Sequence, residues 1–117
     1  MTAPHDAPSA AQLVEAVEEW IRSAVIDGDA EPNRFHARVA ANMLAIVERE
    51  LSLGPAQARA HDARLASLGV ADDAALAAAI RSGAIGDRAA EVRAAVWASV
   101  RDKLAVANPR YLDRVEP

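Results

Sequence analysis

Alanine dominates the apolar residues of this chain and limits the folds that it can adopt. It supplies 30 of the 117 residues, about half of an apolar fraction of 52%. Alanine has the highest helix propensity and lets helices approach one another closely. Residues that favour strands and hairpins are scarce, since aromatic side chains make up only 3% of the chain. The composition therefore predicts an all-α fold with few large side chains for its core.

Length, charge and composition exclude several classes of protein. A chain of 117 residues with a net charge of −4 suits one acidic domain, and no block of Lys and Arg could neutralise a nucleic-acid backbone. The absence of cysteine excludes disulfides and thiolate metal sites. The N-terminus has no secretory signal pattern, and no apolar run approaches the roughly 18 residues of a membrane span. We expect a cytoplasmic protein that binds neither nucleic acid nor membrane.

Helical periodicity and capping residues divide the chain into a single-domain bundle of four to five helices. Residues 1–8 are expected to form a flexible N-terminal arm, residues 9–112 the bundle and residues 113–117 a C-terminal tail. Ser9 and Gln12 have the spacing of a capping box. Gly54 and Pro55 are expected to end the second helix and begin the third. The expected helices cover about 9–25, 34–53, 55–68, 73–81 and 88–107. The expected N-caps are Asn33 for the second helix, Asp72 or Asp73 for the fourth, and Asp87 for the fifth.

The second expected helix, about 34–53, is apolar on two faces. At 3.6 residues per turn its large apolar residues form a main arc and its alanines line much of the other side. The main arc consists of Phe35, Val39, Met43, Ile46 and Val47, and the other side of Ala37, Ala41, Leu44 and Ala45. Such a helix is typical of a central position, so we expect it to be central and to have neighbours on both sides.

Five residues are candidate contacts for a ligand or a partner: His36, Arg38, Asn42, Arg110 and Tyr111. His36 lies within the main arc without metal-ligand residues three or four positions later, which favours a core or interface histidine. Arg38, Asn42 and Arg49 form a polar stripe that could hold a carboxylate or phosphate. The alternative is structural, with a buried Asn42 bonded to the backbone of a neighbouring loop.

The C-terminal segment "NPRY" also allows two interpretations. Asn108 and Pro109 are expected to stop the last helix while Tyr111 folds back onto the core, or Arg110 and Tyr111 anchor a partner. His5 and His61 stand alone on a flexible arm and a weakly amphipathic helix. No motif for a nucleotide, an acyl-transfer nucleophile or a metal occurs in the chain. We therefore predict no catalytic residue, no metal site and no cofactor.

The stretches "RFHARVAANMLAIVEREL" and "KLAVANPRY" carry a resemblance to a known family. They are similar to a family of small, uncharacterised bacterial helical proteins, a domain of unknown function, from the first helix to Tyr111. The resemblance implies genes encoded beside, or fused to, aminoglycoside-phosphotransferase-like kinases and acyl-CoA dehydrogenases. It also implies a shared junction between the second helix and the C-terminal segment.

Two functional hypotheses follow. The leading one is a non-enzymatic helical interaction or accessory domain, either a homo-oligomer or a partner of such a kinase or dehydrogenase. Its basis is the two-faced helix together with the small supply of core side chains, because a marginal core gains from burial against another chain. The alternative is a small-molecule binding protein or enzyme, with an anionic ligand in a pocket formed by His36, Arg38, Asn42, Arg110 and Tyr111.

Overall fold

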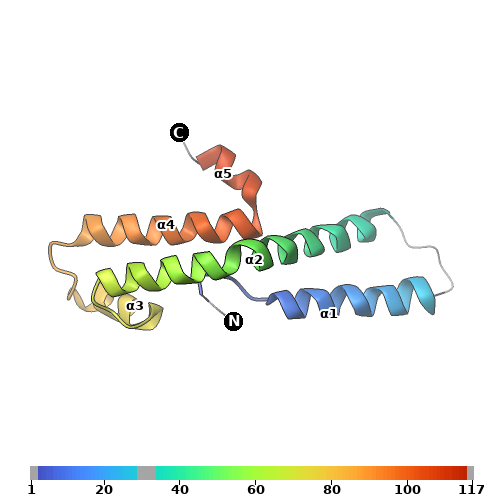
Figure 1. The fold of residues 1–117 in the computed structure, drawn as a ribbon, viewed down its shortest axis with the longest axis horizontal. Helices are drawn as coiled ribbons and strands as arrows, with labels where there is room; N and C mark the ends of the chain where they lie inside the picture. The colour runs from blue at the N-terminus through green and yellow to red at the C-terminus, as the bar shows by residue number, and fades with distance from the viewer. Residues whose placement is uncertain (1–2, 29–33, 116–117) are drawn as a thin grey trace.

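One long helix forms the spine of the molecule (Figure 1). The structure is a computed structural model that describes residues 3–28 and 34–115. Helix α2 (Arg34–Ser67) runs nearly the whole length of the molecule; α1 (Ala10–Trp20) and the π-helical segment η1 (Ile21–Ile26) lie antiparallel to its first half. Helix α4 (Ala89–Ala107) lies along its second half, and α3 (Asp73–Ser82) lies at its C-terminal end. Helix α5 (Pro109–Val115) projects from the end of α4.

The described residues contain five α-helices and no strand, so the predicted all-α bundle is confirmed. The central place of the second helix is also confirmed, because α2 packs against both α1 and α4. None of the described helices is both long enough and apolar enough to cross a bilayer. The C-terminal end differs from the prediction, because helix α5 extends to Val115, into the tail that we expected at 113–117.

The predicted break at Gly54 and Pro55 is wrong. Helix α2 continues through Pro55, so the two helices expected at 34–53 and 55–68 are one helix of 34 residues. An internal proline removes one backbone hydrogen bond and costs roughly 3 kcal/mol. Packing on both sides of the proline offsets this cost: Gly54 is buried beneath His5, and Gln57 bonds to both the N-terminal segment and α4. Tertiary contacts thus override the local signal.

The predicted caps agree with the structure at two of the helix starts. The Ser9 hydroxyl accepts from Gln12 N at 3.2 Å, and the Gln12 side chain accepts from Ser9 N at 2.7 Å, which completes the capping box. Asp72 caps α3 by accepting from Ala75 N at 2.8 Å. At α4 the prediction is wrong, because the helix begins one residue later and Arg88 occupies the cap position in place of Asp87. The predicted cap Asn33 lies outside the described residues.

The core is small and stretched along the spine. A cluster of four buried side chains, Leu65, Leu68, Leu76 and Val92, joins α2, α3 and α4. Val17 and Val47 are the buried residues of α1 and of the first half of α2. The molecule measures 62 × 30 × 24 Å with a radius of gyration of 18.4 Å, whereas a compact domain of about 100 residues has about 13 Å. The fold is therefore elongated, and few of its hydrophobic side chains are buried.

The expected cover on both faces of the second helix is wrong for the single chain, because its alanine side is exposed. Val47 is buried and Val39, Met43 and Ile46 are half-buried, so the main arc is partly covered. Ala37, Ala41 and Leu44 on the other side are exposed. The main arc is not fully covered either, because Phe35 at its beginning is 67% exposed.

Candidate functional site

A polar cavity lies where the middle of α2 meets the end of α4 and the start of α5. Its volume is about 430 Å³. Two of the five candidate contact residues, Asn42 and Arg110, line it together with Arg49 of the predicted polar stripe. The remaining lining residues are Ala45, Ile46, Ala107, Asn108 and Pro109. The structure thus brings the second helix and the C-terminal segment together at one junction.

Backbone hydrogen bonds fix the walls of this cavity. The Arg49 Nε donates to the carbonyl oxygen of Val106 at 2.8 Å, which ties α2 to the last turn of α4. The backbone N–H of Asn108 donates to Leu104 O at 2.8 Å, and Asn108 O accepts from Tyr111 N at 3.0 Å. Asn108 therefore ends α4 and begins the turn into α5. The backbones of α2, of this turn and of α5 thus set where Asn42, Arg49, Asn108 and Arg110 lie.

The other three candidates lie outside this lining. His36 and Arg38 are exposed on the first turns of α2, and Tyr111 is 44% exposed on α5. Two structural interpretations are therefore wrong: His36 is not a core histidine, and Tyr111 does not fold back onto the core. That His36 is an interface histidine stays a prediction. The ring of His36 has an edge contact with Phe35, with ring centroids 5.7 Å apart. Asn42 is also exposed, so it is not the buried asparagine of the structural interpretation.

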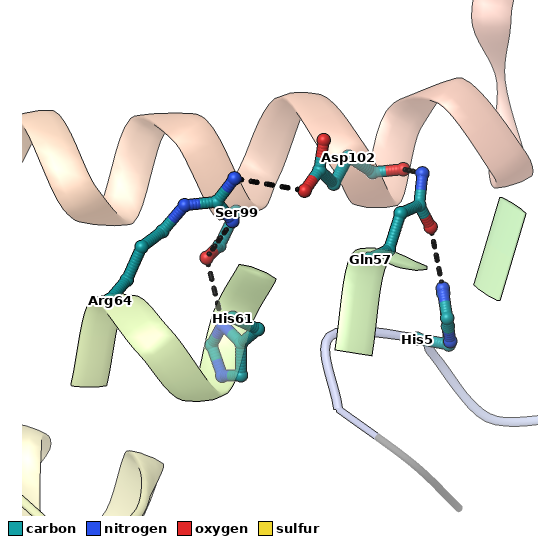
Figure 2. A network of polar contacts seen from close by, with 6 residues as sticks. All are labelled: His5, Gln57, His61, Arg64, Ser99 and Asp102. Carbon is teal, nitrogen blue, oxygen red and sulfur yellow. Dashed lines mark hydrogen bonds and ion pairs between the residues drawn. The ribbon is translucent and has the colours of Figure 1, made fainter. Parts of the chain in front are cut away.

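A polar network that we did not predict links α2, α3 and α4. Figure 2 shows its contacts between α2 and α4. His61, which we expected to stand alone, is only 6% exposed, and its Nδ1 lies 2.7 Å from Ser99 Oγ. Its Nε2 lies 2.9 Å from a carboxylate oxygen of Asp73. Arg64 donates to Ser99 Oγ at 2.9 Å and to Asp102 at 3.0 Å. A neutral His61 with its proton on Nε2 satisfies all of these groups.

Ser99, His61 and Asp73 are residues of the types that serve as nucleophile, base and orienting carboxylate in a catalytic triad. All three line a cavity of about 200 Å³ whose other walls are mostly apolar. Two features favour a structural role. The Ser99 hydroxyl is already held by the Arg64 guanidinium, and Ser99 lies inside α4, where backbone N–H groups are used within the helix instead of forming an oxyanion hole. We interpret the network as a clamp between helices.

A second part of the clamp holds the N-terminal segment. His5 is 7% exposed, and its Nε2 donates to the Gln57 side-chain oxygen at 2.7 Å. Gln57 in turn donates to the Asp102 carbonyl oxygen at 2.8 Å. Asp6 and Lys103 form an ion pair at 3.0 Å nearby. The expectation that His5 stands alone is therefore wrong, because it bonds the segment before α1 to the spine.

The end of α2 is closed by Arg88, which donates to the carbonyl oxygens of Ser67 and Leu68 at 3.2 and 3.1 Å. Glu91 supports this guanidinium with hydrogen bonds of 3.2 Å. The hydrogen bond and the charge of Arg88 lower the pKa of Glu91, and the hydrogen bond of Glu91 raises the pKa of Arg88. This pair therefore caps the C-terminal end of α2, and neither residue lines the polar cavity.

The sequence did contain a signal for the clamp. Gln57, His61 and Arg64 follow one another at intervals of four and three, so they lie on one face of α2, and Ser99 and Asp102 share a face of α4. Large polar residues at helical spacing within alanine-rich helices indicate a polar contact between helices. Among the described residues, no group of three or more His, Asp or Glu side chains has the arrangement of a metal site.

Comparison with known proteins identifies the family but no relative of known function. No curated protein and no solved structure matches the chain. A family model described as a domain of unknown function, DUF6285, matches residues 27–111, more than half of the chain. The match begins after η1, whereas we expected the resemblance to extend from the first helix. It includes the polar cavity and the part of the clamp between α2, α3 and α4, but not His5. The chain belongs to the DUF6285 family, a domain of unknown function.

Proposed function

We propose that this chain is a non-enzymatic helical interaction domain that is completed by another protein chain, and that it self-associates. The observation that carries the proposal is an exposed apolar surface on the α1–α2 hairpin, which we call the flank. It consists of Val14 of α1, Ile21 and Val25 of η1, and Ala37, Ala41, Leu44 and Leu51 of α2. Exposed fractions of 40% to 70% for its larger side chains are high for residues of this kind.

The flank continues along each helix at the spacing of a helix–helix interface. Ala37, Leu44 and Leu51 are seven residues apart, with Ala41 between the first two, as in the seam of a coiled coil. Val14 of α1 and Ile21 of η1 are also seven residues apart. Glu18 and Glu48 interrupt the two stripes, and Glu18 is paired with Arg22 at 3.1 Å. A repeat of this kind predicts a helix packed along the hairpin.

Both stripes lie on the same side of the hairpin. At 100° per residue, Val14 is turned about 60° from the buried Val17 on α1, and Leu44 is turned about 60° from the buried Val47 on α2. The two rotations have the same sense, and the helices run antiparallel (Figure 1), so both stripes point to one side. A cavity of about 370 Å³ supports this, because its lining joins Ala10 and Ala11 of α1 to Leu51 of the flank and to Pro55.

A two-helix hairpin buries too little apolar surface to form a core of its own, and a second hairpin on the flank would make a four-helix bundle. A second copy of the chain supplies two helices of matching length. Contiguous exposed apolar surface is also unusual in a monomer. These arguments support self-association as the first function of the flank.

An accessory role toward an enzyme is the second step of the proposal. Its support is the family resemblance, which implies phosphotransferase-like kinases and acyl-CoA dehydrogenases as neighbours. We propose that the assembled domain binds such an enzyme. The test is to purify the neighbouring kinase or dehydrogenase from the native organism and to measure its binding to the assembled domain by calorimetry.

The experiment for self-association compares two matched variants. Leu44→Lys adds a charge to the flank, where Glu48 one turn later can pair with it, so that the helix itself is preserved. Ala16→Lys adds the same charge to an exposed position on the opposite, polar edge of α1. We expect sedimentation equilibrium to show dissociation for Leu44→Lys alone, with the helical circular dichroism of both variants unchanged. Equal dissociation of both variants would contradict the assignment of the flank.

A further inference from the structure

We propose that the polar cavity between α2 and the α4–α5 junction binds a small organic oxyanion, a phosphate ester or a carboxylate. The cavity is lined by two guanidinium-bearing residues, Arg49 and Arg110, and by no carboxylate. Its local charge is therefore positive, although the chain as a whole carries −4. A positive cavity on an acidic protein attracts anions to one place.

The hydrogen-bonding groups at this cavity are available. Arg49 uses its Nε on the Val106 carbonyl oxygen, which leaves its two terminal nitrogens for another acceptor. Within the part of the chain that the structure describes, no hydrogen bond or ion pair engages the side chains of Asn42, Asn108 or Arg110. Four side chains, two on α2, one on α5 and one at the turn between α4 and α5, thus surround one space with unused donors.

Guanidinium groups bind carboxylates and phosphates through two parallel hydrogen bonds, which gives both affinity and orientation. The two amides can donate to and accept from hydroxyl or carbonyl groups of the same ligand. The apolar part of the lining, Ala45, Ile46, Ala107 and Pro109, suits the carbon skeleton of such a molecule. A volume of about 430 Å³ lies within the range of pockets for small organic ligands.

Binding would also fix α5. This short helix packs only on α4 among the element pairs with substantial contacts. A ligand held between Arg49 on α2 and Arg110 on α5 connects α5 to the spine through charge-assisted hydrogen bonds. The site is separate from the flank, so the inference does not depend on self-association.

The test is a titration of the full chain followed by backbone amide NMR signals at constant ionic strength. The probes are inorganic phosphate, ribose 5-phosphate and succinate, with sodium chloride as the reference for salt effects. We expect saturable shifts of residues 42–49 and 107–111 with at least one organic probe and weaker binding of inorganic phosphate. The ribose 5-phosphate and succinate arms distinguish a phosphate ester from a carboxylate as the preferred anion.

Two variants on the same helix serve as a matched pair. Arg110→Ala removes a lining guanidinium, and Arg114→Ala removes an exposed one outside the lining. Loss of a charge-assisted hydrogen bond predicts a dissociation constant raised roughly tenfold or more for Arg110→Ala and changed less than about twofold for Arg114→Ala. Equal weakening by both variants, or no saturable binding of any organic probe to the unaltered chain, would overturn the proposal.

Discussion

Replacing His61 by alanine tests the clamp between α2, α3 and α4. The substitution removes a hydrogen bond to the buried Ser99, a hydrogen bond to the half-exposed Asp73, and the packing of an imidazole that is 6% exposed. The first bond contributes about 1 kcal/mol, the second about 0.5 kcal/mol because water replaces it, and the packing about 0.5 kcal/mol. Arg64 still donates to Ser99, so Ser99 keeps a partner. We expect a loss of about 2 kcal/mol in the free energy of unfolding.

Urea denaturation followed by circular dichroism measures this loss. All variants are compared at one protein concentration, because self-association would couple to stability. The corresponding decrease in Tm is about 8 °C for a domain of this size. The control is His36→Ala, which changes an exposed histidine on the same helix and is expected to stay within about 0.5 kcal/mol of the unaltered chain. A His61→Ala variant as stable as the control would refute the interpretation of His61 as part of a clamp.

Three further predictions concern the spine. Substitutions of His5 and Gln57 by alanine should be non-additive by about 1 kcal/mol in a double-mutant cycle, since one hydrogen bond of 2.7 Å joins the two side chains; additive losses would show that this bond contributes little. Pro55→Ala should raise the free energy of unfolding by about 1 to 3 kcal/mol, because alanine restores a helical N–H inside α2; urea titration would contradict this with an unchanged or lower midpoint. Asn42→Ala should change the unfolding free energy by less than about 0.5 kcal/mol, because Asn42 is exposed; a loss above 1 kcal/mol would restore the structural role that we first expected.

The sequence predicted the class of fold and most helix boundaries because these depend on local chemistry. Alanine content, apolar periodicity and the Ser9 and Asp72 caps all act within one or two turns of a helix, and the structure agrees with them. The continuity of α2 through Pro55 could not be predicted in this way. It depends on contacts with segments about 50 residues away in the sequence, such as the bond between His5 and Gln57.

The candidate site was predictable in part for the same reason. The stripe of Arg38, Asn42 and Arg49 follows from helical spacing alone, and two of its members line the polar cavity. That Arg110 would join them was implied by the family resemblance, because residue spacing alone does not give the position of α4. His36 was misplaced because periodicity shows which residues share a face but not whether another helix covers that face. His61 was overlooked because its partners Ser99 and Asp73 lie on other helices.

The most direct test of the central claim is the mass of the folded chain in solution. Sedimentation equilibrium at micromolar to millimolar concentration should give at least twice the monomer mass of 12.3 kDa, because the flank requires a second chain to cover it. The Leu44→Lys variant should sediment at 12.3 kDa with its helices intact. A mass of 12.3 kDa for the unaltered chain across that range would contradict self-association through the flank.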